Sequence, residues 1–117
     1  MKLISNQYIK EYLPNGKRVL HDIDDIVAMR GNGPYTLVQM NDNYMFIKAF
    51  TLKEFESLCR PTLLVRVHKR YMVKFTHLHS ISHNSEPKEI IIPNGETIPI
   101  SRRRYNYIKQ VIKQLSK

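Results

Sequence analysis

The 117-residue sequence has a single cysteine, Cys59, and it contains no long hydrophobic run. One cysteine excludes an intramolecular disulfide framework, which is typical of proteins in a reducing compartment. No apolar stretch approaches the roughly 20 residues that span a bilayer, and the N-terminus lacks the hydrophobic segment of a signal peptide. We therefore expect a cytoplasmic protein that does not associate with a membrane.

Acidic residues are scarce in the second half of the chain. Residues 60–117 contain twelve Lys and Arg but only three Asp and Glu, whereas residues 1–59 contain seven of each class. The whole net charge of +9 therefore lies in the second half. Such a polarised excess is typical of proteins that neutralise the phosphates of a nucleic acid. The alternative is a basic face that serves solubility alone.

Recognisable catalytic motifs are also missing. The sequence has no G-x-S-x-G, H-E-x-x-H or phosphate-binding glycine loop. His77, His79 and His83 have an even spacing that would share one face of a strand, so a metal site is an alternative, but no nearby Cys or carboxylate completes a zinc spacing. We expect neither catalytic activity nor a metal, cofactor or small-molecule substrate.

The pattern of apolar residues predicts a mainly β chain that forms one domain, residues 1–117. Short apolar runs separated by turn residues predict an antiparallel meander over residues 7–48 and further strands over 63–67, 71–75, 77–82, 89–92 and 97–100. A capping-box pattern at Thr51 and Glu54 predicts a short helix near 51–58. The helical spacing of Tyr105, Ile108 and Ile112 behind Ser101, a good N-cap, predicts a C-terminal helix near 102–115.

Three segments carry candidate nucleic-acid ligands. In SRRR, residues 101–104, three cations occupy a first helical turn, where the helix dipole disfavours them and invites an anion. In RVHKRYMVK, residues 66–74, Lys69 and Arg70 lie on a connection between two predicted strands, where binding groups are common. His68 beside them has two interpretations, a turn-capping histidine or a base reader. The GNGP turn, residues 31–34, permits close backbone approach, and Asn32 is suited to adenine or phosphate. Taken alone it is equally well an ordinary hairpin loop, so it is a candidate only if it lies beside the other two segments.

RVHKRYMVK followed by PNGETIPISRRRYNYIKQVIKQL resembles the signature of LytTR-type DNA-binding domains, and DDIVAMRGNGPYTLVQM with TLKEFE is similar to the earlier strands and helix of that family. The match covers about residues 17–115. The resemblance implies an elongated antiparallel β fold of small stacked sheets that binds double-stranded DNA and regulates transcription. It also implies that loops and a helix start enter successive major grooves. The candidate DNA-binding residues are Arg30, Asn32, Pro34, His68, Lys69, Arg70, Lys74, Arg102, Arg103 and Arg104.

The chain departs from the family pattern at two positions of the second motif. Arg70 stands where the family usually has Ser, a change that alters the target sequence or adds a phosphate contact. Lys74 stands where it usually has Asn, which puts the local turn geometry in doubt. Family members often carry a receiver domain before this module, so the chain is either a stand-alone regulator or an excised domain.

Several alternatives to a DNA-binding regulator remain. An RNA-binding or protein-interaction module would also use the basic second half, although its aromatic residues form no RNP-like run. An enzyme would have to use the clustered acids Asp22, Asp24 and Asp25, of which Asp24 and Asp25 match the family's turn before a strand. A homodimer on repeated half-sites is compatible with DNA binding because pairing adds affinity, but no coiled coil or apolar patch identifies its interface.

Overall fold

The protein is an elongated stack of small antiparallel sheets, which confirms the predicted fold class. The structure is a computed structural model that describes residues 7–58, 64–82, 84, 86 and 88–115. Its principal extents are 47 × 26 × 25 Å. None of the helices in this described part is both long and apolar enough to cross a membrane.

Ten strands, two α-helices and two 3-10 helices make up the described chain. In order they are β1 (Tyr8–Tyr12), β2 (Arg18–Asp22), η1 (Ile23–Asp25), β3 (Ile26–Asn32), β4 (Tyr35–Met40), β5 (Met45–Lys48), α1 (Leu52–Leu58), β6 (Leu64–His68), β7 (Tyr71–Lys74), η2 (Phe75–Ser80), β8 (Ile81–Ser82), β9 (Glu89–Ile91), β10 (Thr97–Pro99) and α2 (Arg102–Leu115). The strands form a β1-β2 hairpin, a five-stranded sheet of order β5-β4-β3-β7-β6 and a three-stranded sheet of order β10-β9-β8.

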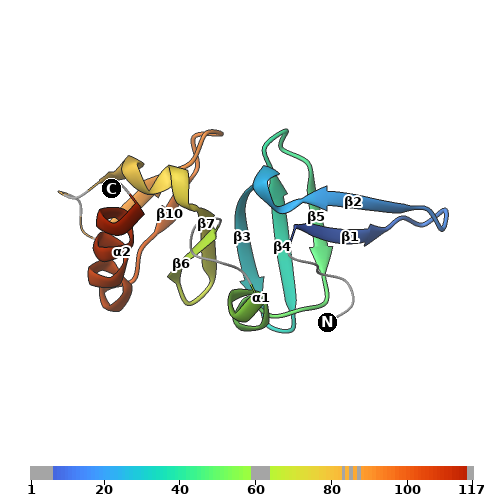
Figure 1. The fold of residues 1–117 in the computed structure, drawn as a ribbon, viewed down its shortest axis with the longest axis horizontal. Coiled ribbons are helices and arrows are strands. Elements are labelled where there is room, and N and C mark those ends of the chain that lie inside the picture. The colour runs from blue at the N-terminus through green and yellow to red at the C-terminus, as the bar shows by residue number, and fades with distance from the viewer. Residues whose placement is uncertain (1–6, 59–63, 83, 85, 87, 116–117) are drawn as a thin grey trace.

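The five-stranded sheet lies between two hydrophobic clusters. One cluster includes Ala28, Val67, Val73 and Ile108 and joins the sheet to α2 and the three-stranded sheet. The other includes Met29 and Met72 and joins the sheet to α1 and the β1-β2 hairpin; its remaining buried members are Ile9, Ile23, Ile26, Val38, Met40, Phe46, Phe50, Leu52, Phe55 and Leu64. Strand residues such as Ala28 and Met29 alternate between the clusters, because side chains of a strand point to opposite faces, except at the irregularity between Ile26 and Ala28. Figure 1 shows the resulting succession of layers along the long axis.

Both helix starts follow the predicted capping chemistry. At α1 the Thr51 N–H donates to Glu54 Oε1 over 3.0 Å, and the Glu54 N–H donates to Thr51 Oγ1 over 3.1 Å, which completes the capping box. At α2 the Arg104 N–H donates to Ser101 Oγ over 3.2 Å. The two helices therefore begin where the sequence predicts, and Tyr105 and Ile112 pack against the core beside buried Ile108.

The predicted strand over residues 77–82 is wrong for most of its length. Residues 75–80 form the 3-10 helix η2, and only Ile81 and Ser82 are strand. Phe75, Leu78 and Ile81 face the core at every third position, which is the period of a 3-10 helix and not of a strand. His77 and His79 therefore do not share a strand face, and His83 and Cys59 lie outside the described residues. Within the part of the chain that is described, no three His, Cys, Asp or Glu side chains are grouped to hold a metal ion.

Candidate nucleic-acid interface

The β6-β7 turn is held in a defined shape by its own residues. The Arg70 N–H donates to His68 Nδ1 over 3.1 Å, which supports the turn-capping interpretation of this histidine. The His68 ring also packs edge-on against Tyr71, with 5.4 Å between ring centroids. Burial, reinforced by the charges of Arg70 and Arg66, lowers the pKa of His68 below its usual value, so the ring is neutral near pH 7 and its Nδ1 accepts a hydrogen bond. Lys69 and Arg70 are exposed at the tip of the turn.

The β3-β4 hairpin lies beside this turn. The Gly31 N–H donates to the carbonyl oxygen of Arg70 over 2.8 Å, so the end of β3 is joined to the turn by a backbone hydrogen bond. Asn32 and Pro34 are exposed at the hairpin tip, where Gly33 has a φ of 59° that favours glycine. The GNGP turn therefore lies beside one of the two other candidate segments, the β6-β7 turn.

The first turn of α2 lies on the other side of the β6-β7 turn. The Ser101 N–H donates to the carbonyl oxygen of Val67 over 3.0 Å, which fixes the start of α2 at the end of β6. In Figure 1 the hairpin, the turn and the start of α2 follow one another along the lower edge of the molecule. We call this surface, made of residues 30–35, 68–71 and 101–104, the basic edge.

The arginines of the α2 start differ in their surroundings. The side chain of Arg102 is 91% exposed, and its Nε lies 3.7 Å from Glu86 Oε1, a loose surface pair. Arg103 is exposed as well. The side chain of Arg104 is only 24% exposed, and its guanidinium pairs with Glu56 Oε2 at 3.1 Å. Arg102 and Arg103 are therefore the arginines of this turn that are placed to meet an external anion.

Two other predicted cations are engaged within the protein. Arg30 forms an ion pair with Glu96, and hydrogen bonds from Arg30 and Asn94 hold the pKa of the Glu96 carboxyl below its usual value. Lys74 lies at the end of β7 opposite the β6-β7 turn, where its Nζ donates to the carbonyl oxygen of Asp24. The structure thus brings Arg30 to the basic edge as a paired residue and places Lys74 away from it.

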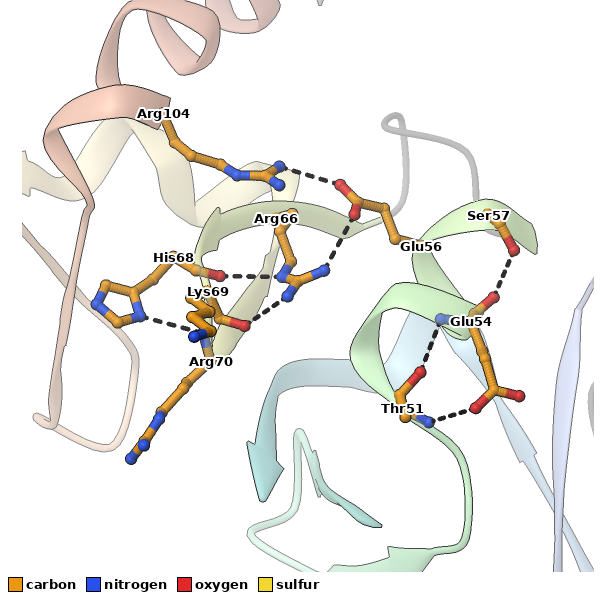
Figure 2. Close-up of polar contacts among 9 residues, drawn as sticks. All are labelled: Thr51, Glu54, Glu56, Ser57, Arg66, His68, Lys69, Arg70 and Arg104. Carbon is orange, nitrogen blue, oxygen red and sulfur yellow. Dashed lines mark hydrogen bonds and ion pairs between the residues drawn. The ribbon is translucent and has the colours of Figure 1, made fainter. Parts of the chain in front are cut away.

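Sequence reasoning missed two residues that organise this site, Arg66 and Glu56. Arg66 on β6 donates from Nε to the carbonyl oxygen of His68 over 3.0 Å and from a terminal nitrogen to that of Lys69. Its other terminal nitrogen pairs with Glu56 Oε1 at 3.0 Å, as Figure 2 shows. The available signal is Leu64, which precedes Arg66 by two residues and shares its face of the predicted strand, because a cation on an apolar face needs an internal partner.

Comparisons with known proteins agree with the geometry. The model of the LytTR family, described as the LytTr DNA-binding domain, matches residues 16–113. The transcriptional regulatory protein BtsR of Escherichia coli (strain K12) is 30% identical over 116 aligned residues, which cover 94% of this chain and 46% of BtsR. The heme-containing CO-sensing transcriptional regulator RcoM 1 of Paraburkholderia xenovorans is 24% identical over 96 residues, which cover 80% of this chain and 36% of that protein.

The fold also matches a solved structure. A LytTr DNA-binding domain from Bacillus cereus superposes with a TM-score of 0.78 over 92% of this chain and 98% of that one, at 17% sequence identity. At that identity the likeness concerns the fold alone. The chain spans less than half of the length of the two regulators it resembles.

Proposed function

The chain belongs to the LytTR family of DNA-binding domains, and on that premise we propose that it regulates transcription by binding double-stranded DNA sequence-specifically. The observation that carries the proposal is the pair of backbone hydrogen bonds, Gly31 to Arg70 and Ser101 to Val67, that joins three separate basic segments along one edge. Both regulators to which the chain is similar are described as transcriptional, which supports the same function.

We assign direct DNA contact to the exposed members of the basic edge. Asn32 has the paired donor and acceptor that suit adenine, and arginine can donate to both O6 and N7 of guanine. Lys69, Arg70, Arg102 and Arg103 add positive charge at exposed positions, where each neutralised phosphate releases counterions. The molecule is 47 Å long, longer than the about 34 Å of one turn of B-DNA, so a chain lying along the duplex has room to reach successive major grooves.

Selection of bound duplexes from a random pool tests the function and yields the target sequence. Replacing Lys69 or Arg102 with Ala should cost about 1–3 kcal/mol on the selected duplex if the residue reads a base, and should flatten the salt slope by about one unit if it contacts a phosphate. Unchanged affinity for both variants at low salt would remove these residues from the interface. Stronger competition by duplex RNA than by duplex DNA would contradict DNA as the partner.

Pairing of two copies on repeated half-sites extends the proposal. Two short sites bound together gain affinity because the second contact becomes intramolecular. Duplexes that carry two selected sites at variable separation test it. Cooperative binding should recur with a spacing of about 10 base pairs, since copies one helical turn apart lie on the same face of the duplex.

A further inference from the structure

The carboxylate of Glu56 joins three elements, α1, the next element β6 and the distant helix α2. Its Oε1 accepts from Arg66 on β6 at 3.0 Å, and its Oε2 accepts from Arg104 on α2 at 3.1 Å. Glu56 itself lies on α1, at a position 36% exposed. In Figure 2 both guanidinium groups point toward this carboxylate, whereas the Arg70 side chain extends away from it.

Arg66 transmits this contact to the β6-β7 turn. One edge of its guanidinium pairs with Glu56, and its remaining nitrogens donate to two consecutive carbonyls of the turn, those of His68 and Lys69. Hydrogen bonds to two consecutive carbonyls fix both peptide planes, and the planar, rigid guanidinium makes that geometry specific. The direction in which the Lys69 and Arg70 side chains leave the backbone therefore depends on where Arg66 is held.

The charges make Glu56 necessary to this arrangement. The side chains of Arg66 and Arg104 are 11% and 24% exposed, so solvent screens them only in part. Both guanidinium groups share one carboxylate. Without Glu56 two partly buried guanidinium groups would lose their common counter-charge, and removing one partner of such a network leaves an uncompensated charge.

We propose that Glu56 is a positioning residue for DNA recognition, which holds Arg66 and Arg104 so that the β6-β7 turn presents Lys69 and Arg70 in one orientation. This inference rests on the proposed function. It also reassigns Arg104, which contributes to the interface through Glu56 and not through contact with DNA.

Loss of Glu56 should weaken the sequence-specific part of DNA binding while it strengthens the sequence-independent part. Removing a negative charge near the basic edge strengthens the sequence-independent attraction to any duplex. A misplaced turn weakens only the contacts that depend on orientation, because base readout is directional whereas phosphate attraction is not. The ratio of specific to non-specific affinity is therefore the quantity that reports the role of Glu56.

The test compares Glu56→Gln with Glu54→Gln. Glu54→Gln removes the same charge two residues away on the same helix and keeps the capping box, since Gln serves in it as Glu does. Both variants should bind a random duplex more tightly at low salt, to a similar extent. Only Glu56→Gln should lower the ratio of specific to non-specific affinity, by about tenfold, at a temperature where both are folded. An equal ratio in the two variants would overturn the proposal.

If Glu56→Gln does not fold, a second pair of variants, Arg103→Gln and Arg104→Gln, tests the proposal. Arg103→Gln should reduce the salt slope of DNA binding by about one unit, as expected for a phosphate contact, and Arg104→Gln should leave that slope as it is in the wild type. A matching reduction in Arg104→Gln would place this arginine on the DNA and contradict its assignment to Glu56.

Hydrogen exchange gives a readout without DNA. The Gly31 amide donates to the Arg70 carbonyl of the turn, so its exchange should accelerate in Glu56→Gln and stay as in the wild type in Glu54→Gln. Unaltered protection in Glu56→Gln would overturn the positioning role. If the wild-type chain preferred no duplex in the random pool, the proposed function would fail, while the exchange measurement would still decide whether Glu56 holds the turn.

Discussion

Gly31 is in contact with Leu52 as well as with the β6-β7 turn. A Cβ added at Gly31 would lie 3.0 Å from Leu52 Cδ1 and 3.1 Å from its Cγ, closer than ordinary van der Waals contact. Leu52 is buried at the start of α1. The end of β3 therefore approaches both the turn and the helix that carries Glu56, and a side chain at Gly31 would disturb this junction.

Gly31→Ala should lower the free energy of unfolding by about 1–2 kcal/mol, because the added methyl group overpacks the contact with Leu52. In a Leu52→Ala background, which removes the two clashing atoms, the same substitution should cost markedly less. Denaturant titrations of the four proteins measure this coupling. Gly33→Ala is the control: its Cβ would meet nothing within 4 Å, so its cost comes from the positive φ and should be the same in both backgrounds. If Gly31→Ala cost as much stability in the Leu52→Ala background as in the wild type, the predicted clash with Leu52 would be contradicted.

Lys74 and Lys69 should respond differently to the same loss of charge. Lys69 is exposed on the basic edge, whereas the Lys74 amine is bound to the carbonyl oxygen of Asp24 at the other end of β7. Lys69→Ala should flatten the salt slope of DNA binding by about one unit, and Lys74→Ala should not. If both variants had the same salt slope, below that of the wild type, Lys74 would contact DNA as the sequence predicts.

Much of the fold is readable from the sequence because its signals are local. The capping box at Thr51 and Glu54 and the N-cap at Ser101 involve residues three apart, and both are present. The 3-10 helix is hidden in the sequence because residues 77–82 contain only two apolar residues, Leu78 and Ile81, and their spacing of three does not by itself establish a period. That period becomes evident only once Phe75 is counted as part of the core.

The candidate site was only partly predictable, for a physical reason. Charge and motif pick out the basic segments, but they do not distinguish an exposed cation from a paired one. Arg30 pairs with Glu96 across 66 positions, and Arg104 pairs with Glu56 across 48. Such partners depend on tertiary packing, which no local pattern encodes. The same distance in sequence hides the role of Glu56.

Acidification should destabilise the fold through His68. Burial and the neighbouring Arg70 and Arg66 lower the pKa of His68 in the folded protein. The unfolded chain therefore takes up a proton first as the pH falls through its usual value near 6.5, and stability is lost from there down to the lower folded pKa. His77, whose pKa is lowered by burial, Lys74 and His79, acts in the same direction. Thermal melts between pH 7.5 and pH 5.5 should show this loss.

The variant His68→Asn separates the contribution of His68 to the pH dependence of stability from that of His77. The Asn side-chain oxygen can accept the Arg70 N–H in an Asx turn, as Nδ1 does, but it does not titrate. The variant loses the ring contact with Tyr71 and should be less stable than the wild type near neutral pH, but it should lose less stability on acidification. A pH dependence identical to that of the wild type would assign the effect to groups other than His68.

Charge reversal at Arg103 should raise the stability of the fold while it weakens DNA binding. Arg103 is exposed in the first turn of α2, where the positive end of the helix dipole disfavours a cation, so Arg103→Glu should raise the free energy of unfolding by about 0.3–1 kcal/mol. The same change places an anion on the basic edge and should sharply weaken DNA binding.

Lys113→Glu is the matched control, since it makes the same reversal in the last turn of the same helix, where a cation is favoured. It should lower stability and leave the salt slope nearly unchanged. Melting curves and binding isotherms over a range of salt measure both quantities. If Arg103→Glu lowered stability as Lys113→Glu does, the arginine would serve the fold, and the energetic cost of three cations at this helix start would no longer indicate a DNA contact.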